Sequence, residues 1–432
     1  MSVFYFFLNL IIFIFFIKQL RLVGSNFISM PGLYYVLSFL PVFSLLSLEL
    51  MASDSLRLGY SDYLNAITIH SLSVGIGIFC SYLLFNKGST PSRCYSESFS
   101  FKSAPQADKY VLFLVFFVVI IFFHQLLSLA SVPFLMMFTD GSVSELTMAR
   151  EVGYKLQGGL SIYIWHFSRM VLVPFLVILF FVKHIGKRTW VSFFQFIFIL
   201  SIGIFNNGLS GAKAPVAMLF FCMFIAFVLL KGDFKFKYLL VAIFFIFIFP
   251  FLVEYSYSEN NFLDTLNIFT QKVIKRFSHE TFDRTLSYFD SFPYVLDYLG
   301  GRTNSLFLLF SQESYFNVQN FIFIERIDGD VKEHLLHGSA NAHFISYMYA
   351  DFGIVGVVLS CLLVGIIIGF LDVKCSNRIK YTESFSLYIV MAFIFWKLMG
   401  SQPTTVLFSH GALLSFFMLL FFYYVNKNNI RY

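Results

Sequence analysis

The sequence predicts an all-helical, polytopic membrane protein, and three observations lead to that fold class. The chain is 58% hydrophobic and only 12% charged, whereas soluble domains carry about 25% charged residues. Long apolar runs recur from one end of the chain to the other, and the mean hydropathy is +0.77. Basic residues gather in alternate connections between these runs. We therefore expect lipid to surround most of the molecule.

The apolar runs define the expected spans, because a helix needs about 20 apolar residues to cross a bilayer. About eleven runs meet this criterion, and the first and sixth are short. No basic stretch precedes the first run and no small-residue cleavage site follows it, so we expect it to be retained as a helix. The runs are Val3–Ile17, Leu33–Leu50, Leu64–Phe85, Tyr110–Ala130, Ser161–Val182, Trp190–Phe205, Ala214–Leu230, Tyr238–Glu254, Phe352–Asp372, Ser384–Gly400 and His410–Val425.

The charges between the runs predict the orientation. Alternate connections are basic, and the intervening ones are acidic or mixed, which by the positive-inside rule makes the basic set cytoplasmic. The N-terminus is then extracytoplasmic and the C-terminus cytoplasmic. The basic set comprises Lys18, Arg21, Lys87, Arg93, Lys102, Lys109, Lys183, Lys187, Arg188, Lys231, Lys235, Lys237, Lys374, Arg378, Lys380, Lys427 and Arg431.

A long polar segment divides the chain into three parts: transmembrane residues 1–254, an extracytoplasmic loop at 255–351, and transmembrane residues 352–432. A connector of about 100 residues is expected to have structure of its own. Within it, apolar residues recur every three or four positions from Phe262 to Phe277, which predicts an amphipathic helix at the membrane surface. Lys272, Arg276, His279 and Asp283 follow a neighbouring stripe. Glu280 and Arg284 interrupt the apolar stripe, so the helix is expected to end there.

Several function classes are excluded by the absence of their motifs. The chain has no phosphate-binding glycine loop, no dinucleotide fingerprint and no zinc-protease motif. None of its five cysteines lies in the 255–351 loop, and their spacing matches no metal or redox site. Because the basic connections account for the net charge of +6, we expect no nucleic-acid partner. The missing motifs and the cysteine spacing lead us to expect no metal and no cofactor.

Cations on the predicted outer face are the candidates for anion binding. Lys213 follows the turn containing Gly208 and Gly211 at the mouth of a helix, where it could form an anion site or extend to the lipid headgroups. Arg150 has Glu145 and Glu151 as local partners. The remaining candidates are Arg276, Arg284, Arg302 and Arg326, of which some are expected to pair with Asp283, Asp297 or Asp328.

Histidines and a carboxylate near the end of the loop are the candidates for proton transfer. His337 and His343 could act as a base or contact a substrate, and Asp351 lies at a predicted membrane boundary, where charges are often functional. Arg169 shares that status. Gly356, Gly365 and Gly369 after Asp351 are expected to allow close packing of helices.

Two stretches carry a family resemblance. GLSGAKAPVAMLFF at 208–221 and HGSANAHFISYMYADFGIVGVVLSCLLVGIIIGFLD at 337–372 resemble the Wzy-type O-antigen polymerases and their enterobacterial common antigen relatives. The layout of spans around one large loop is similar too, although members of that family often carry Arg where this chain has Lys213. The resemblance implies a GT-C-like helical glycosyltransferase of the bacterial inner membrane that joins undecaprenyl-diphosphate-linked oligosaccharide repeat units on the periplasmic face.

The resemblance assigns roles to the candidate residues. His337, Asp351 and Arg276 are expected to be catalytic, while Lys213, Arg150, Arg284, Arg302 and Arg326 are expected to bind diphosphate and glycan. The implied partners are lipid-linked oligosaccharides, membrane lipids, a chain-length regulator and a flippase. Two other functions stay open from the sequence: an O-antigen ligase, and a flippase or other transporter of lipid-linked sugars.

Overall fold

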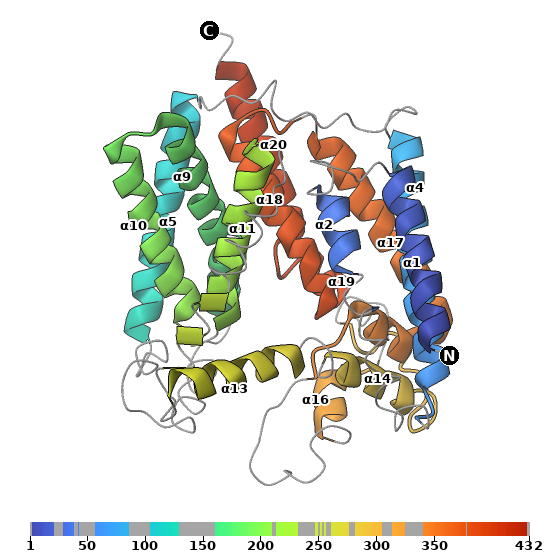
Figure 1. Cartoon of the computed structure of the whole chain (residues 1–432). Coiled ribbons are helices and arrows are strands. Elements are labelled where there is room, and N and C mark those ends of the chain that lie inside the picture. The colour runs from blue at the N-terminus through green and yellow to red at the C-terminus, as the bar shows by residue number, and fades with distance from the viewer. Residues whose placement is uncertain are drawn as a thin grey trace. The chain divides into compact units, whose positions relative to one another are not determined.

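The computed structural model describes an all-helical chain (Figure 1). It describes residues 2–20, 29–38, 42, 57–85, 104–128, 160–209, 213–231, 247–248, 251–252, 255, 261–275, 281–304, 313–324, 340–376 and 378–429. Seven helices in these ranges are long and apolar enough to cross a membrane, and two shorter apolar helices cover Val3–Gln19 and Pro215–Lys231. The chain is therefore a multi-pass membrane protein. Most of the second and eighth predicted spans lie outside the described residues, so the count of eleven stays a prediction.

The chain divides into two compact units. Unit 1 comprises Met1–Ser92, Gln271–Lys374 and Phe395–Leu407. Unit 2 comprises Arg93–Thr270, Cys375–Ile394 and Phe408–Tyr432. One of the boundaries between the units, after Thr270, falls inside the long loop.

Unit 1 is built around one long helix, α4 (Tyr60–Phe85), which packs against α1, α2 and α14. Polar side chains reinforce this packing. Asn9 donates a hydrogen bond to Thr68 over 2.9 Å, and the hydroxyl of Tyr35 donates to the carbonyl of Ser71 over 3.0 Å. The other helices of unit 1 are α1 (Ser2–Gln19), α2 (Met30–Leu37), α14 (Thr281–Ser291), α16 (Val318–Ile322), α17 (Phe344–Ser376) and α19 (Pro403–Leu407).

Small residues bring α4 and α17 into backbone contact, as the sequence predicts. A Cβ added to Gly365 would lie 3.1 Å from the Cα of Gly77, and one added to Gly369 would lie 2.8 Å from the Cβ of Ser81. Gly356 was also predicted to allow close packing of helices, but its nearest neighbours do not belong to a second helix. Its nearest neighbours are Met348 and Phe352 of the same helix, because α17 bends at Gly353, whose φ is +61°.

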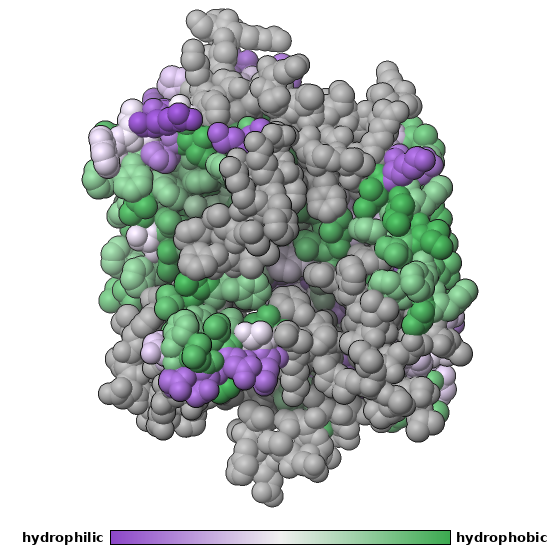
Figure 2. All heavy atoms as spheres, in the orientation of Figure 1, coloured by the Kyte–Doolittle hydropathy of each residue, from purple (hydrophilic) through white to green (hydrophobic). Residues whose placement is uncertain are grey.

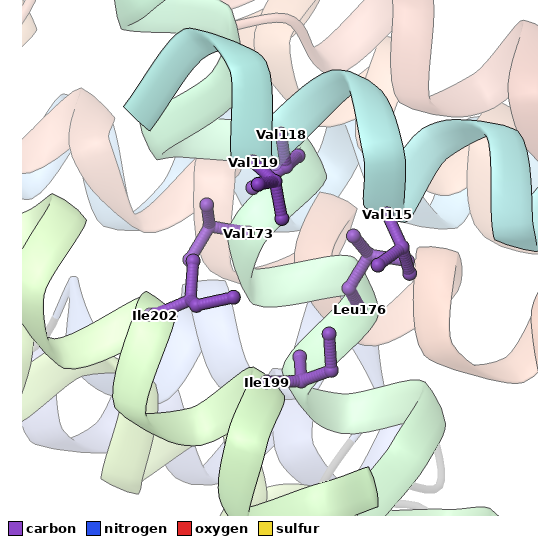
Figure 3. A pocket seen from close by; sticks show the side chains of 8 residues that line it. Val115, Val118, Val119, Val173, Leu176, Ile199 and Ile202 are labelled. Carbon is purple, nitrogen blue, oxygen red and sulfur yellow. The ribbon is translucent and has the colours of Figure 1, made fainter. Parts of the chain in front are cut away.

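Unit 2 contains the helices α5 (Pro105–Ser128), α9 (Val173–Lys187) and α10 (Trp190–Gly208), which pack on one another. Figure 3 shows branched side chains from these three helices pointing toward one another. They line a small apolar pocket. The surface of the same helices is mostly green in Figure 2, with purple at their upper ends, as expected for lipid-facing spans with charged termini. The other helices of unit 2 are α8 (Leu160–Phe167), α11 (Lys213–Lys231), α13 (Phe262–Lys275), α18 (Thr382–Trp396) and α20 (Ala412–Asn429), with the π-helix η3 (Ser168–Leu172) between α8 and α9.

A buried polar network joins four segments of unit 2 at the Lys187 end of α9. Lys183 approaches Asp108 at 2.6 Å and Glu383 at 3.5 Å. Asn426 donates to Glu383 over 3.1 Å and accepts from the backbone of Ala104 over 2.7 Å. Glu383 is fully buried, so its charge depends on Lys183 for compensation.

Helix α13 confirms the amphipathic pattern in the long loop. Phe262 and Phe269 pack edge-on against Phe251 at centroid distances of 5.3 and 5.6 Å. Figure 2 shows green atoms along one side of this helix and purple atoms along the other. The described part of α13 runs to Lys275, and α14 is described from Thr281. Residues 276–280, which include the predicted end at Glu280, lie outside the described residues. Asp283, which the sequence pattern placed on the same helix, therefore lies on α14.

Candidate functional site

The predicted site residues are only partly described by the structure. Lys213 begins α11, which fits the predicted turn-to-helix position, but its side chain is not described. Arg284, Arg302 and Asp351 are described, and all three belong to unit 1. The predicted site residues that lie outside the described residues are Arg150, Arg276, Arg326 and His337.

Asp351 lies in a buried hydrogen-bond cluster. It is 1% exposed, and its Oδ2 accepts from the Thr303 hydroxyl at 2.5 Å while Oδ1 accepts from the Thr303 backbone N–H at 3.2 Å. Gln402 donates to the carbonyl of Thr303 over 2.8 Å, and the Gly300 N–H donates to the carbonyl of Asp351 over 2.9 Å. This geometry fixes the 299–304 turn against α17. The catalytic role of Asp351 stays a prediction.

Arg302 has local partners in the same part of unit 1. Its Nε donates to the carbonyl of Ser314 over 3.2 Å and lies 3.8 Å from Glu313. The guanidinium also lies 5.9 Å from the ring centroid of Phe316. Because the side chain remains one-third exposed, it could still contact an anion, as the sequence predicts.

Arg57, a cation that the sequence did not single out, is a partner of Asp283. Its guanidinium forms ion pairs with Asp283 and Asp290 and donates to Ser287 over 3.0 Å. Burial lowers the pKa of Arg57, but the charges and hydrogen bonds of Asp290 and Asp283 outweigh it, so the pKa is raised. Asp290 also accepts from the N–H of Gly59 over 2.9 Å. These contacts attach α14 to the start of α4, and Arg284 is half-buried on the same helix.

A carboxylate surrounded by tyrosines lies at the same end of α4. Asp62 is in the first turn of that helix, and its Oδ2 accepts from the hydroxyls of Tyr349 at 2.7 Å and Tyr294 at 3.3 Å. The ring of Tyr298 meets Tyr349 edge-on at 5.8 Å. Tyr349 is buried, whereas Tyr294 and Tyr298 are 49% and 43% exposed. The cluster is therefore open on its tyrosine side.

Two histidines meet in the interior of unit 1. The rings of His70 and His343 lie 4.7 Å apart edge-to-face, and the Tyr34 hydroxyl lies 3.2 Å from Nε2 of His70. Nδ1 of His343 accepts from the Ile345 N–H over 3.3 Å, which leaves the ring proton on Nε2. Within the described residues, Nε2 has no hydrogen-bond partner. Buried polar atoms without a partner are rare in folded proteins, so this atom is a candidate functional group.

The burial of His343 predicts acid sensitivity. Burial, and next the neighbouring His70, hold the pKa of His343 well below its ordinary value of 6.5. The unfolded chain then binds the proton more readily than the folded chain does. The free energy of unfolding therefore has its full value above pH 6.5 and falls as the pH is lowered from 6.5 toward the pKa of His343 in the folded protein. Below pH 6.5, His343 is expected to lower the free energy of unfolding by up to about 1.4 kcal/mol per pH unit. His343→Asn should abolish this part of the pH dependence. Thermal unfolding in detergent between pH 5 and 7.5 measures it.

The control for this prediction is His124→Asn, which changes an exposed histidine on α5. We expect that variant to keep the pH dependence of the unaltered protein. Identical pH profiles for His343→Asn and the unaltered protein would contradict the interpretation.

Arg169 occupies an unusual position in unit 2. It lies in the π-helix η3, is 5% exposed, and its guanidinium is 5.3 Å from the ring centroid of Trp165. Asn206 at the end of α10 is fully buried and lies 3.5 Å from the Ser168 hydroxyl. Single-turn π-helices often occur at functional sites. The sequence identified Arg169 by its charge, but it could not predict the π-helix.

The described residues contain no group of three or more metal-ligating side chains. The described residues of unit 1 instead hold three polar clusters: Asp62 with its tyrosines, Asp351 with Thr303, and His70 with His343. Carboxylates and histidines of this kind can bind hydroxyl groups and transfer protons. Sequence reasoning missed Asp62, His70 and the tyrosines. The one sequence feature that pointed to them is that tyrosines are frequent near both ends of the loop, but these tyrosines have no regular spacing.

No family model, curated protein or solved structure matches this chain.

Proposed function

We propose that this chain is a glycosyltransferase of the bacterial inner membrane that joins lipid-linked oligosaccharide repeat units into a polysaccharide on the periplasmic face. The observation that carries the proposal is the arrangement of unit 1. Residues 281–304 and 340–351, which belong to the long loop, pack along α4: they bring tyrosine hydroxyls to Asp62 in its first turn and His343 to His70 farther along the helix. This combination suits a substrate whose sugar lies in water and whose anchor lies in lipid.

The predicted orientation supports the same proposal. Unit 2 gathers Lys183, Lys187 and Arg188 at one end of α9, which the positive-inside rule assigns to the cytoplasm. Asp62 and the long loop follow spans that lead to the opposite side. An enzyme on that side has no nucleotide supply, so a lipid diphosphate would be both the donor's leaving group and its source of free energy.

The chemistry that we propose has two requirements. Charge develops on the diphosphate as it leaves, and arginines and lysines stabilise such charge. Arg276, Arg284, Arg302, Arg326, Arg150 and Lys213 are our candidates for this role. The attacking hydroxyl must lose its proton to a carboxylate or a histidine, for which His337, His343 and Asp351 remain candidates.

The test is a deletion of the coding sequence in its own host. We expect lipid A to carry a single repeat unit in place of long chains, because units are still made and ligated but are not joined. Gel electrophoresis of the lipopolysaccharide measures the result, and complementation in trans should restore the long chains.

Other outcomes would support the rival functions. A lipid A core that bears no repeat unit would indicate a ligase. Repeat units that accumulate on the cytoplasmic side would indicate a flippase. Normal long chains in the deletion strain would end the proposal.

A further inference from the structure

We propose that Asp62, Tyr294 and Tyr298 form the subsite for the acceptor sugar, with Asp62 as the base that receives the proton of the attacking hydroxyl. This inference rests on the proposed function. It concerns residues that neither the sequence motifs nor the family resemblance identified, and it follows from the geometry at the first turn of α4.

The carboxylate of Asp62 is oriented by its neighbours. Both tyrosine hydroxyls, from Tyr349 and Tyr294, donate to the same oxygen, Oδ2, at 2.7 and 3.3 Å. Within the described residues, no hydrogen-bond donor reaches Oδ1. One oxygen therefore fixes the orientation of the group, and the other is left to accept a hydrogen bond from a substrate hydroxyl.

The positive charge closest in sequence does not neutralise this carboxylate. Arg57, five residues before Asp62, forms its ion pairs with Asp283 and Asp290 and also donates to Ser287. Asp290 is a second carboxylate near the cluster, but it is bound by Arg57 and by the N–H of Gly59. Of these acidic groups on α4 and α14, Asp62 is the one that forms its hydrogen bonds to tyrosines instead of to a cation.

The tyrosines supply a surface for a sugar ring. Tyr294 and Tyr298 are 49% and 43% exposed, although each is anchored at one side. Tyr298 packs over Gly353, where an added Cβ would lie 2.9 Å from Cζ of the tyrosine ring. Tyr298 also contacts the buried ring of Tyr349. An anchored aromatic face with a polar hydroxyl packs against the C–H face of a pyranose while a carboxylate binds its hydroxyls.

Gly353 couples the subsite to the bend in α17. Its φ of +61° is a left-handed conformation that side chains with a Cβ rarely adopt. The absence of a Cβ is also what allows the ring of Tyr298 to approach the backbone. Gly353 therefore permits both the bend in α17 and the close packing of Tyr298 on the backbone.

The proposed step balances as follows. The acceptor hydroxyl oxygen forms a bond to the anomeric carbon of the donor sugar, and the bond from that carbon to the diphosphate oxygen breaks. The electron pair of the broken bond leaves with the lipid diphosphate. The hydroxyl proton passes to Oδ1 of Asp62.

The experiment compares Asp62→Asn, Tyr298→Ala and the control Asp264→Asn. Asp264 is also an aspartate in the first turn of a helix, α13, and it is exposed. Each variant is expressed in the deletion strain, and its rate of chain extension is measured. Each is also purified in detergent and titrated calorimetrically with the oligosaccharide released by mild acid from the polysaccharide of the parent strain.

We expect Asp62→Asn to slow chain extension at least about 100-fold while oligosaccharide affinity changes less than about threefold, because an amide still binds hydroxyls. Tyr298→Ala should weaken the affinity about tenfold. Asp264→Asn should match the unaltered protein in both measurements. Asp62→Glu, which keeps the carboxylate, should restore part of the rate.

Two results would overturn the proposal: normal chain extension by Asp62→Asn, or unchanged oligosaccharide affinity in folded Tyr298→Ala. If Asp62→Asn does not elute as a single monodisperse species, the rate of chain extension by Asp62→Glu and the oligosaccharide affinity of Tyr298→Ala test the proposal instead. Failure of the proposed function is recognised separately, because the deletion strain itself would then keep its long chains, and the titrations would still report whether the sugar subsite exists.

Discussion

Replacing Gly365 with valine is expected to prevent α4 and α17 from packing, and it should have the largest structural effect of any single change considered for this chain. An added Cβ would contact the carbonyl oxygen of Val74 and lie 3.1 Å from the Cα of Gly77. Both neighbours are backbone atoms, which cannot rotate away. We expect a loss of at least about 3 kcal/mol, measured as the midpoint of thermal unfolding in detergent.

Two further variants make this prediction specific. Gly77→Val should be equally damaging, because Gly77 and Gly365 meet each other across the same contact. Gly400→Ala is the matched control, since a Cβ there would meet no atom within 4 Å. It should change the stability by less than about 0.5 kcal/mol. A Gly365→Val protein as stable as the Gly400→Ala protein would show that the two helices do not meet as described.

The second large effect is expected for Asp351→Ala. The Thr303 hydroxyl and N–H would both lose the acceptors that they have in a buried site. Each buried unsatisfied group costs about 1–3 kcal/mol, so we expect a total loss of about 3 kcal/mol and release of the 299–304 turn. Hydrogen exchange of the Gly300 and Thr303 amides measures the release directly.

Asp351→Asn separates this structural role from the predicted catalytic role. The asparagine side chain has nearly the same shape and can keep hydrogen bonds to Thr303, so the variant should fold with nearly unchanged stability. A folded Asp351→Asn protein that cannot extend chains would support the catalytic role predicted from the sequence, whereas one that extends chains normally would show that the role of Asp351 is structural. Thr303→Val provides a double-mutant cycle, in which the effects of the two changes should be non-additive by about 1 kcal/mol.

The helical architecture could be read from the sequence because it depends on local properties. The apolar runs at 64–85, 110–130 and 190–205 coincide with α4, α5 and α10, since a segment of about 20 apolar residues has one stable form in lipid. The amphipathic pattern that predicted α13 is equally local. Gly365 and Gly369 were recognisable as packing residues because small side chains allow close approach in any helix pair.

The candidate site could be predicted only in part, because its contacts join distant segments. Asp62 and Tyr349 are 287 residues apart in the chain, and Arg57 and Asp283 are 226 apart. Neither pair has a spacing or motif that the sequence could reveal. Asp283, one of the carboxylates offered as partners for the cations of the loop, pairs with Arg57 from the segment that precedes α4.

The sequence by itself determined that lipid surrounds this protein, where most of its spans lie, and that α13 is amphipathic. Hydropathy and helical periodicity are local properties that can be read from a few helical turns. Only the tertiary structure decided which oxygen of Asp62 is occupied, that Asp351 is enclosed by Thr303, and that His343 meets His70. Side-chain contacts of this kind depend on how helices far apart in sequence are brought together, and that arrangement is fixed by packing and not by local preference.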